Sequence, residues 1–350
     1  MNEAVPKSVA LPSGGPWPTS DPFLFCVHHH DDYPSGNSDH GPSVSLRGRD
    51  IGQDFSQRDG WNMYHGDVVP GFPQHPHRGF ETISVMRGGL MDHADSLGAA
   101  ARFGSGDVQW MTAGAGIVHS EMFPLLDQDR PNPLEMFQIW LNLPRKDKFV
   151  DPYFTMLWDA QVPRLIALDK HGRKCEVTIV AGVLDGLSAA PPPPNSWAAR
   201  PEADVAVWHI RLDAGARWVM PPAASSDAVR TLYCYSGTGL AIDETTVGAR
   251  TANVVSSDGP VTLAATTGPV ECLVLQGCPI GEPVAQYGPF VMNDRGGIVQ
   301  AYDDYERTRF GGWPWPSDGP VHGDEAVRFA RHADGRIEHP PARAGAPLTV

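Results

Sequence analysis

Four residues in two short stretches have the types and the spacing of metal ligands. GFPQHPHRGFETISVMRG carries His75 and His77, and GDVQWMTAGAGIVHSE carries His119 and Glu121. One residue separates the two members of each pair, and in a β-strand residues two apart point to the same face. The two pairs could therefore close on one metal ion. Such a site would place a mononuclear metal in the mouth of a small β-barrel.

The donor types restrict the metal and its chemistry. Three imidazoles and one carboxylate suit iron(II), manganese, nickel, copper or zinc, and ligand type alone does not choose among these ions. Four protein ligands leave up to two open positions on an octahedral ion, which is room for a bidentate substrate or for dioxygen together with a substrate. A closed tetrahedral site would instead indicate structural zinc. The mouth of a barrel favours the open arrangement.

Other polar residues compete for this role. The run HHHDD at residues 28–32 contains three consecutive histidines. A strand would send neighbouring side chains to opposite faces, so we interpret this run as a polar loop beside the barrel. Isolated histidines such as His93 are predicted to be surface or hydrogen-bonded residues. Glu81 follows His77 by four positions and is a further carboxylate close to the first pair.

Charge and cysteine content exclude several classes of protein. The net charge of −14 over 350 residues disfavours general binding to a nucleic-acid backbone. The five cysteines include no C-x-x-C pair, which is typical of a reduced protein without a disulfide framework. No run approaches the roughly 18–20 apolar residues of a membrane span, and the N-terminus lacks the apolar segment of a secretory signal. We therefore predict a cytoplasmic protein that binds neither membranes nor nucleic acid.

The elements that position the candidate ligands are predicted to be short strands. Apolar and polar residues alternate over residues 82–87 and 136–144, and the 37 glycines and 34 prolines punctuate the chain without a collagen-like period. This pattern favours an all-β barrel or sandwich. The GAG at residues 114–116 is not a dinucleotide fingerprint, because His119 stands where the third glycine would be.

The chain is predicted to hold two domains. Four consecutive prolines at residues 191–194 form a stiff extended spacer. We therefore expect an N-terminal metal-binding domain over residues 1–185, with an extended arm at its start, a Pro-rich linker over residues 186–204, and a second domain over residues 205–350.

The second half resembles the first without its histidines. TLYCYSGTGL at residues 231–240 aligns weakly with TISVMRGGLM at residues 82–91, which indicates a duplicated barrel. No histidine occurs from residue 210 to residue 321, so the second barrel is predicted to lack a histidine-built metal site. Short helices are predicted in the tail, one beginning near Asn293 and one over residues 323–332.

Four stretches resemble the signature sequences of the pirin family, within the cupin superfamily: HPHRGFET, GDVQWMTAGAGIVHSEM, FQIWLNLP and PIGEPVAQYGPFVMN. The resemblance implies an all-β bicupin, in which two cupin-type barrels face each other and short C-terminal helices follow. It also implies one metal ion, usually iron, bound in the N-terminal barrel by His75, His77, His119 and Glu121. In this assignment Glu81 lies beside the ligands and is not a ligand itself.

The resemblance leaves the function open between alternatives. Some pirins resemble quercetinases, flavonol 2,3-dioxygenases in which a small aromatic substrate and dioxygen meet at the metal. Here Glu121 would be the catalytic base, with Phe72, Phe80, Trp110 and Met111 as candidate walls of the site. Other pirins are described as redox-sensing co-regulators that bind a protein partner without catalysis. A metalloenzyme with a different substrate is a third alternative.

Overall fold

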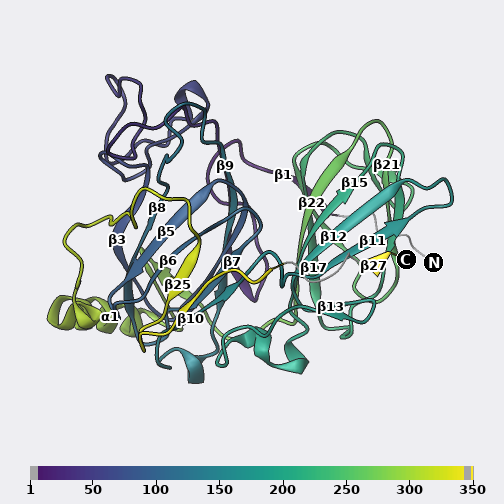
Figure 1. The fold of residues 1–350 in the computed structure, drawn as a ribbon. Helices are drawn as coiled ribbons and strands as arrows, with labels where there is room; N and C mark the ends of the chain where they lie inside the picture. The colour runs from purple at the N-terminus through teal and green to yellow at the C-terminus, as the bar shows by residue number, and fades with distance from the viewer. Residues whose placement is uncertain (1–6, 343–347, 350) are drawn as a thin grey trace. The chain divides into compact units, whose positions relative to one another are not determined.

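The computed structural model describes residues 7–342 and 348–349. The chain divides into two compact units (Figure 1). The N-terminal unit contains residues 28–159 and 282–341, and the C-terminal unit contains the described residues of 1–27, 160–281 and 342–350. Each unit is built from β-sheets, which confirms the all-β prediction.

Two sheets form the N-terminal unit. Their strand orders are β10-β7-β4-β9-β2 and β26-β25-β6-β5-β8-β3. The first sheet consists of β2 (Phe23–Asp31), β4 (Phe80–Gly88), β7 (Val108–Thr112), β9 (Leu134–Asn142) and β10 (Tyr153–Leu157). The second consists of β3 (Gly71–His77), β5 (Leu90–Asp95), β6 (Ala100–Gly104), β8 (Ile117–Met122), β25 (Phe329–Arg331) and β26 (Ile337–Glu338).

A hydrophobic core lies between these two sheets. Met86, Met111 and Met136 come from neighbouring strands of the first sheet, and Met91 and Ile117 come from the second. Since successive side chains of a strand alternate between faces, every second residue of β4, β7 and β9 points into this core. The same alternation decides which polar residues reach the interior of the unit.

The C-terminal unit repeats the two-sheet plan. Its sheets have the orders β1-β20-β17-β22-β15-β12-β11-β27 and β16-β21-β18-β19, with a separate hairpin of β13 and β14. The strands are β1 (Lys7–Ala10), β11 (Arg164–Leu168), β12 (Lys174–Ala181), β13 (Val183–Leu184), β14 (Leu187–Ser188), β15 (Ala206–Leu212), β16 (Arg217–Met220), β17 (Val229–Ser236), β18 (Leu240–Ile242), β19 (Thr245–Thr246), β20 (Thr251–Val255), β21 (Val261–Ala265), β22 (Val270–Gly277) and β27 (Leu348–Thr349). Its core is apolar, with Trp208, Ile210, Leu232, Cys234 and Val274 among its members.

The units do not end where the proline run suggested. β12 pairs antiparallel with β15 along most of its length, so residues 160–185 belong to the C-terminal unit and not to the N-terminal domain. The expected linker at residues 186–204 therefore lies inside one unit. The expected loose arm also contains β1, whose described residues pair with β20 of the C-terminal unit. Strand pairing places both residues 160–185 and β1 in the C-terminal unit, and the local composition of these segments did not reveal this pairing.

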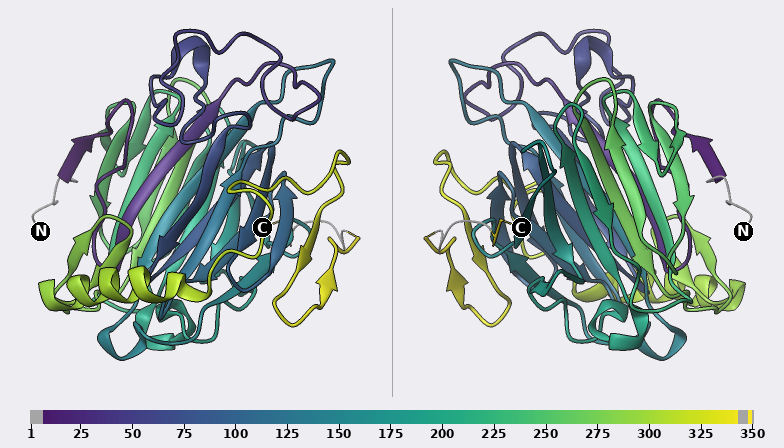
Figure 2. Two further views of the ribbon diagram at one scale, coloured as in Figure 1. Left: turned by 90° about the vertical axis from the view of Figure 1, so that its left-hand side faces the viewer. Right: turned by 90° about the vertical axis from the view of Figure 1, so that its right-hand side faces the viewer.

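The tail contains one of the two predicted helices. α1 (Arg295–Thr308) begins after Asp294, whose carboxylate accepts a hydrogen bond from the Gly297 N–H at 2.8 Å. It lies beside the hairpin of β23 (Ala285–Tyr287) and β24 (Phe290–Met292) (Figure 2). The helix predicted over residues 323–332 is wrong, because this stretch ends in β25, which pairs antiparallel with β6.

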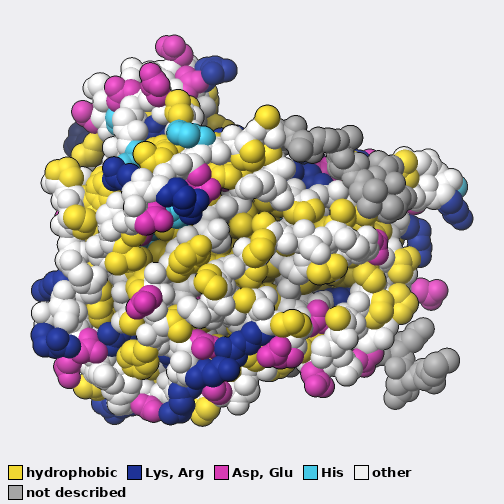
Figure 3. All heavy atoms as spheres, turned by 60° about the horizontal axis from the view of Figure 1, so that its bottom comes forward, with side chains coloured by type: hydrophobic (Ala, Val, Ile, Leu, Met, Phe, Trp, Pro, Cys, Tyr) yellow, Lys and Arg dark blue, Asp and Glu magenta, His cyan; other side chains and the backbone are white. Residues whose placement is uncertain are grey.

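Five 3-10 turns complete the described elements: η1 (Arg58–Gly60), η2 (Arg145–Asp147), η3 (Trp197–Ala199), η4 (Pro201–Ala203) and η5 (Arg309–Gly311). On the face drawn in Figure 3, Lys and Arg side chains are interspersed with Asp and Glu. Among the described residues, no helix has both the length and the apolar character needed to cross a membrane.

Candidate metal centre

β3 and β8 bring the predicted ligand pairs together. The two strands pair antiparallel, with His75 opposite His119 and His77 opposite Ile117. Residues directly opposite each other in such a pair have their side chains on the same face. His75, His77, His119 and Glu121 therefore share one face of the sheet.

Three of these residues form a compact histidine cluster. His75, His77 and His119 each offer a ring nitrogen, and these nitrogens lie within 4.8 Å of one another. The ring centroids are 4.8 Å apart for His75 and His77, 4.4 Å for His75 and His119, and 4.9 Å for His77 and His119. His77 and His119 are buried and His75 is half-buried. The cluster could hold a metal ion.

Hydrogen bonds fix the tautomers of two of the histidines. His75 Nδ1 lies 2.9 Å from the carbonyl oxygen of Pro73, and His77 Nδ1 lies 3.3 Å from that of Pro289. A carbonyl oxygen only accepts, so each Nδ1 carries the proton and each Nε2 keeps its lone pair. In metal-binding histidines the ring nitrogen that does not bind the metal typically donates a hydrogen bond of this kind to a carbonyl oxygen.

His119 gives the clearest sign that a group is meant to bind here. Both of its ring nitrogens are buried and have no hydrogen-bond partner in the described part of the chain. Buried polar atoms are seldom left unpaired, because the loss of their hydration is costly. A metal ion would satisfy one of these nitrogens together with the lone pairs of His75 and His77. The donor set thus fits a divalent ion.

Burial also keeps the cluster in the form that binds metal. It lowers the pKa of His75 to about 4. The pKa values of His77 and His119 fall well below the ordinary range, first through burial and then through repulsion from neighbouring histidines. All three rings are therefore neutral at pH 7, and only a neutral imidazole coordinates a metal.

Glu121, the fourth predicted ligand, is not among the residues whose donor atoms lie within 4.8 Å of one another, and its carboxylate is held by other side chains. Gln138 Nε2 donates to both carboxylate oxygens, at 3.1 and 3.0 Å, and the Ser84 hydroxyl donates to one of them at 3.1 Å. Burial raises the pKa of Glu121, while nearby His93 and these hydrogen bonds lower it. The carboxylate is thus oriented before any ion binds.

Glu81 occupies a different place. In β4 it stands opposite Thr112 and Leu141, whereas Ser84, three residues later, lies on the face that reaches Glu121. Its carboxylate accepts a hydrogen bond from the Thr112 hydroxyl at 2.7 Å. The expectation that Glu81 lies beside the ligands is wrong, because the strand alternation turns its side chain to the opposite face of the sheet.

The aromatic surroundings differ in part from the predicted walls. The ring of Phe72 lies 6.4 Å from that of His75, and Phe80 lies 5.0 Å from His77. Trp140, which the sequence did not single out, lies 5.4 Å from His77. Trp110 stands opposite Ile83 and so faces away from Ser84.

His93 is a further residue that sequence reasoning did not place at the site. It is buried, its ring lies 5.6 Å from that of His119, and its Nε2 lies 3.2 Å from Asp95 Oδ2. In β5 it stands opposite Glu121 of β8. The spacing of His93 and Asp95 predicts that their side chains share one face of a strand. Only the pairing of β5 with β8 shows that this face lies at the histidine cluster.

The histidine run at residues 28–30 is not a loop. It forms part of β2, where His28 Nε2 lies 3.0 Å from Glu135 Oε1 and His29 Nδ1 lies 2.8 Å from the Tyr64 hydroxyl. As expected from strand alternation, this run does not contribute to the histidine cluster among the described residues.

Comparison with known proteins agrees with this architecture. The Pirin family matches residues 49–141, and the Pirin C-terminal cupin domain family matches residues 207–311. A pirin-like protein of Caulobacter vibrioides is 36% identical over 71% of this chain and 84% of its own length. A Pseudomonas aeruginosa protein with the provisional name quercetin 2,3-dioxygenase is 39% identical over 69% of this chain and 79% of its own length.

The solved structures include a quercetin 2,3-dioxygenase from Acinetobacter baumannii. It superimposes with a TM-score of 0.66 and 26% identity, over 83% of this chain and 87% of that one. The two-barrel cupin prediction is therefore confirmed. Together with the two family matches and the pirin-like relative that is 36% identical, this shows that the chain belongs to the pirin family.

Proposed function

We propose that this protein is a metal-dependent dioxygenase of the quercetin 2,3-dioxygenase type, with its centre in the N-terminal unit. The ligands would be His75, His77, His119 and Glu121, and the ion would be iron(II), with copper, nickel, manganese and zinc as alternatives. The observation that carries the proposal is the convergence of three neutral imidazoles, one of which has both nitrogens buried without a partner.

A bound divalent ion would act as a Lewis acid that lowers the pKa of a flavonol hydroxyl. The residues around it divide the remaining tasks. Glu121 accepts the proton of that hydroxyl at a carboxylate oxygen, and its burial makes the carboxylate a stronger base than an exposed one. Gln138 and Ser84 orient the carboxylate, so its position does not depend on the substrate.

The named relatives support an enzymatic function. Proteins named for quercetin 2,3-dioxygenase occur among both the sequence relatives and the solved structures, the latter with 26% identity. The comparisons do not favour the regulatory alternative. Flavonol and dioxygen as substrates, and a cytoplasmic location, belong to the proposal.

The test is an oxygen-dependent assay of purified protein. The chain is freed of metal, loaded anaerobically with iron(II) or copper, and mixed with quercetin and oxygen while the flavonol absorbance is followed. We expect loss of absorbance with wild type and none with His75→Ala. His171→Ala is the matched control, because His171 is exposed and lies in the C-terminal unit.

Metal content measured on the same samples tests the ligands separately. We expect about one ion per chain in wild type and in His171→Ala, and much less in His75→Ala. Full metal content in His75→Ala would refute the ligand assignment. Full content in wild type without loss of flavonol, with each of the ions above, would refute the quercetinase proposal.

A further inference from the structure

The segment between β2 and β3 pairs with the first residue of β3. Residues 32–70 form the loops drawn above β3 and β8 in Figure 1. Within this segment Asp54 and Tyr64 pair antiparallel, and Tyr64 in turn forms a parallel bridge with Gly71, the first residue of β3. The segment is thus joined by backbone pairing to the strand that carries His75.

Four aromatic rings of this region form a continuous patch that ends at the cluster. We call Phe55, Tyr64, His65 and Phe72 the aromatic patch. The Phe55 ring lies 5.1 Å from His65 and 5.5 Å from Tyr64, and His65 lies 5.6 Å from Phe72. Phe72 in turn lies 6.4 Å from His75, the half-buried member of the cluster. The outer end is open, because Phe55 is 53% exposed.

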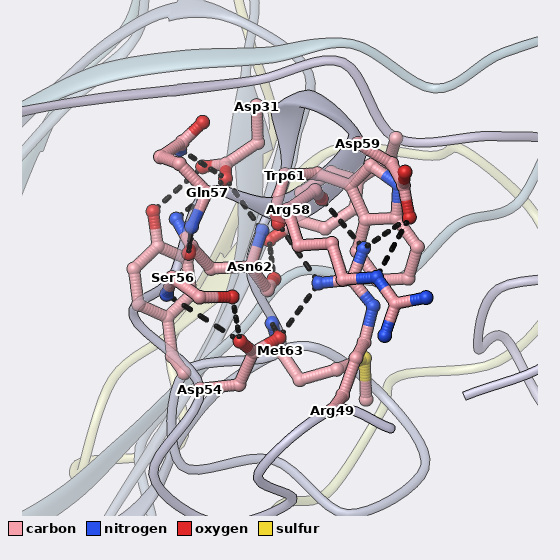
Figure 4. Close-up of polar contacts among 12 residues, drawn as sticks. Asp31, Arg49, Asp54, Ser56, Gln57, Arg58, Asp59, Trp61, Asn62 and Met63 are labelled. Atoms are coloured by element: carbon pink, nitrogen blue, oxygen red, sulfur yellow. Dashed lines mark hydrogen bonds and ion pairs between the residues drawn. The ribbon is translucent and has the colours of Figure 1, made fainter. Parts of the chain in front are cut away.

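Polar contacts hold Asp54 and Ser56, the two neighbours of Phe55, in place (Figure 4). The Asp54 carboxylate accepts hydrogen bonds from Arg49 at 2.7 Å, from the Ser56 hydroxyl at 2.7 Å and from the Met63 N–H at 3.1 Å. Arg49 also lies over the Trp61 ring at 3.3 Å. Both neighbours of Phe55 are therefore fixed. An exposed aromatic ring on a fixed backbone is suited to bind a ligand with little loss of entropy.

His65 adds a polar atom to this apolar surface. Its Nδ1 lies 2.7 Å from the carbonyl oxygen of Gly52 and therefore carries the ring proton. In the neutral ring Nε2 then keeps a lone pair and can accept a hydrogen bond. The patch thus combines flat apolar rings with one acceptor, which is the complement of a planar aromatic compound that carries hydroxyl groups.

We propose that the aromatic patch is a binding site for a planar hydroxylated aromatic substrate on its way to the histidine cluster. Phe55 stacks on the substrate, and His65 Nε2 accepts a hydrogen bond from one of its hydroxyls. The choice of a flavonol as probe rests on the proposed function, but the binding role of the patch does not require turnover.

The test is an anaerobic titration of the iron(II)-loaded protein with quercetin, followed by quenching of protein fluorescence. We expect Phe55→Ala to bind about tenfold more weakly, because a stacked aromatic pair and its buried area are lost. Phe55→Leu keeps an apolar side chain and should fall between this variant and wild type. Val68→Ala is the control, since Val68 lies in the same segment and is also 53% exposed. It should bind like wild type.

The acceptor is tested by comparing quercetin with unsubstituted flavone. His65→Asn keeps a donor near Gly52 but has no atom at the Nε2 position. We expect it to weaken quercetin binding about three- to tenfold while changing flavone binding less. The metal contributes equally to quercetin binding by wild type and by His65→Asn. Its contribution therefore cancels when the affinities of the two proteins for one ligand are compared.

The outcomes separate this inference from the proposed function. Quercetin binding that depends on Phe55 and His65, without any flavonol loss when oxygen is admitted, would support the patch and refute the dioxygenase. Wild-type affinity in Phe55→Ala and His65→Asn, or failure of wild type to bind quercetin at all, would overturn the patch whatever the turnover. Circular dichroism and metal content of each variant show whether the fold and the cluster are intact.

Discussion

The hydrogen bonds that hold Glu121 can be tested with Gln138→Leu. Gln138 Nε2 lies 3.1 and 3.0 Å from the two carboxylate oxygens, and Glu121 as a whole is only 4% exposed, so bulk water does not readily replace the lost donor. A hydrogen bond to a charged group contributes about 1.5–3 kcal/mol. We therefore expect the unfolding free energy of the metal-free protein to fall by about 2 kcal/mol.

Two effects keep this loss from being larger. Ser84 Oγ donates to Glu121 at 3.1 Å and also lies 2.6 Å from Gln138 Oε1, so its hydroxyl becomes wholly available to the carboxylate. Burial already raises the pKa of Glu121 and the Gln138 amide opposes this rise. Without the amide the pKa rises further, and partial protonation relieves the unpaired charge.

The matched control is Gln109→Leu. Gln109 and Gln138 stand opposite Ser84 on the two strands that flank β4, and both are buried. Gln109 Nε2 has no hydrogen-bond partner in the described part of the chain. Replacing this unpaired amide with an apolar side chain of similar size should leave stability unchanged or raise it, because an unpaired buried group costs about 1–3 kcal/mol. Urea denaturation in the presence of chelator, with linear extrapolation, measures both variants. Equal losses in the two variants would refute the positioning role of Gln138.

Three further substitutions test other parts of the N-terminal unit. Burial raises the pKa of Asp31 from 3.8 to about 6. The folded chain therefore binds more protons than the unfolded chain in this window, and stability falls as the pH rises from 4 to 6. In Asp31→Asn the unfolding free energy should therefore fall less between pH 4 and pH 7 than in wild type, by up to about 3 kcal/mol. Denaturation of both proteins at a series of pH values measures this difference. Gly71→Ala should abolish metal binding in calorimetry, because its Cβ would lie 2.4 Å from a backbone oxygen of β8, whereas Gly98→Ala, which meets nothing within 4 Å, should not. Asp92→Asn breaks a fully buried ion pair with Arg102 and should cost about 3–5 kcal/mol in thermal or urea denaturation.

The sequence predicted the histidine cluster because its geometry is local. One intervening residue places His75 and His77 on one face of β3, and the same spacing places His119 and Glu121 on one face of β8. Only the pairing of these two strands remained to be supplied, and the pirin resemblance supplied it. The acidic residue at position 81 shows the limit of such reasoning, since the face it occupies depends on the register of β4 with β7 and β9.

The features that were missed depend on which segments come into contact, and some of these segments lie far apart along the chain. β12 joins the C-terminal unit through β15, and β25 adds to β6 more than 220 residues away along the chain. The aromatic patch depends on Phe55, which lies in a polar Gly- and Ser-rich segment and carries no periodic signal. Composition and periodicity describe neighbours in sequence, so they could not reveal these pairings.

The two units share an architecture but differ in what their interiors contain. The C-terminal unit buries polar atoms without a partner among the described residues: Trp208 Nε1, Arg230 Nη2 and Asn253 Oδ1. In the N-terminal unit three such atoms are ring nitrogens of His93 and His119, whose rings lie 5.6 Å apart at the histidine cluster. Each unpaired buried group costs about 1–3 kcal/mol, so the site lowers the stability of its own unit.

That cost falls where a bound ion can offset it. An ion held by the histidine cluster pairs a nitrogen of His119 and adds a binding free energy that the unfolded chain does not receive. Local departures from good packing are expected at functional sites and not at structural ones. The N-terminal unit should therefore gain more stability than the C-terminal unit when a divalent ion is added. Hydrogen exchange of β3 and β8 against β15 and β22, with and without a divalent ion, measures this gain. Equal added protection of both pairs of strands, or none in β3 and β8, would contradict it.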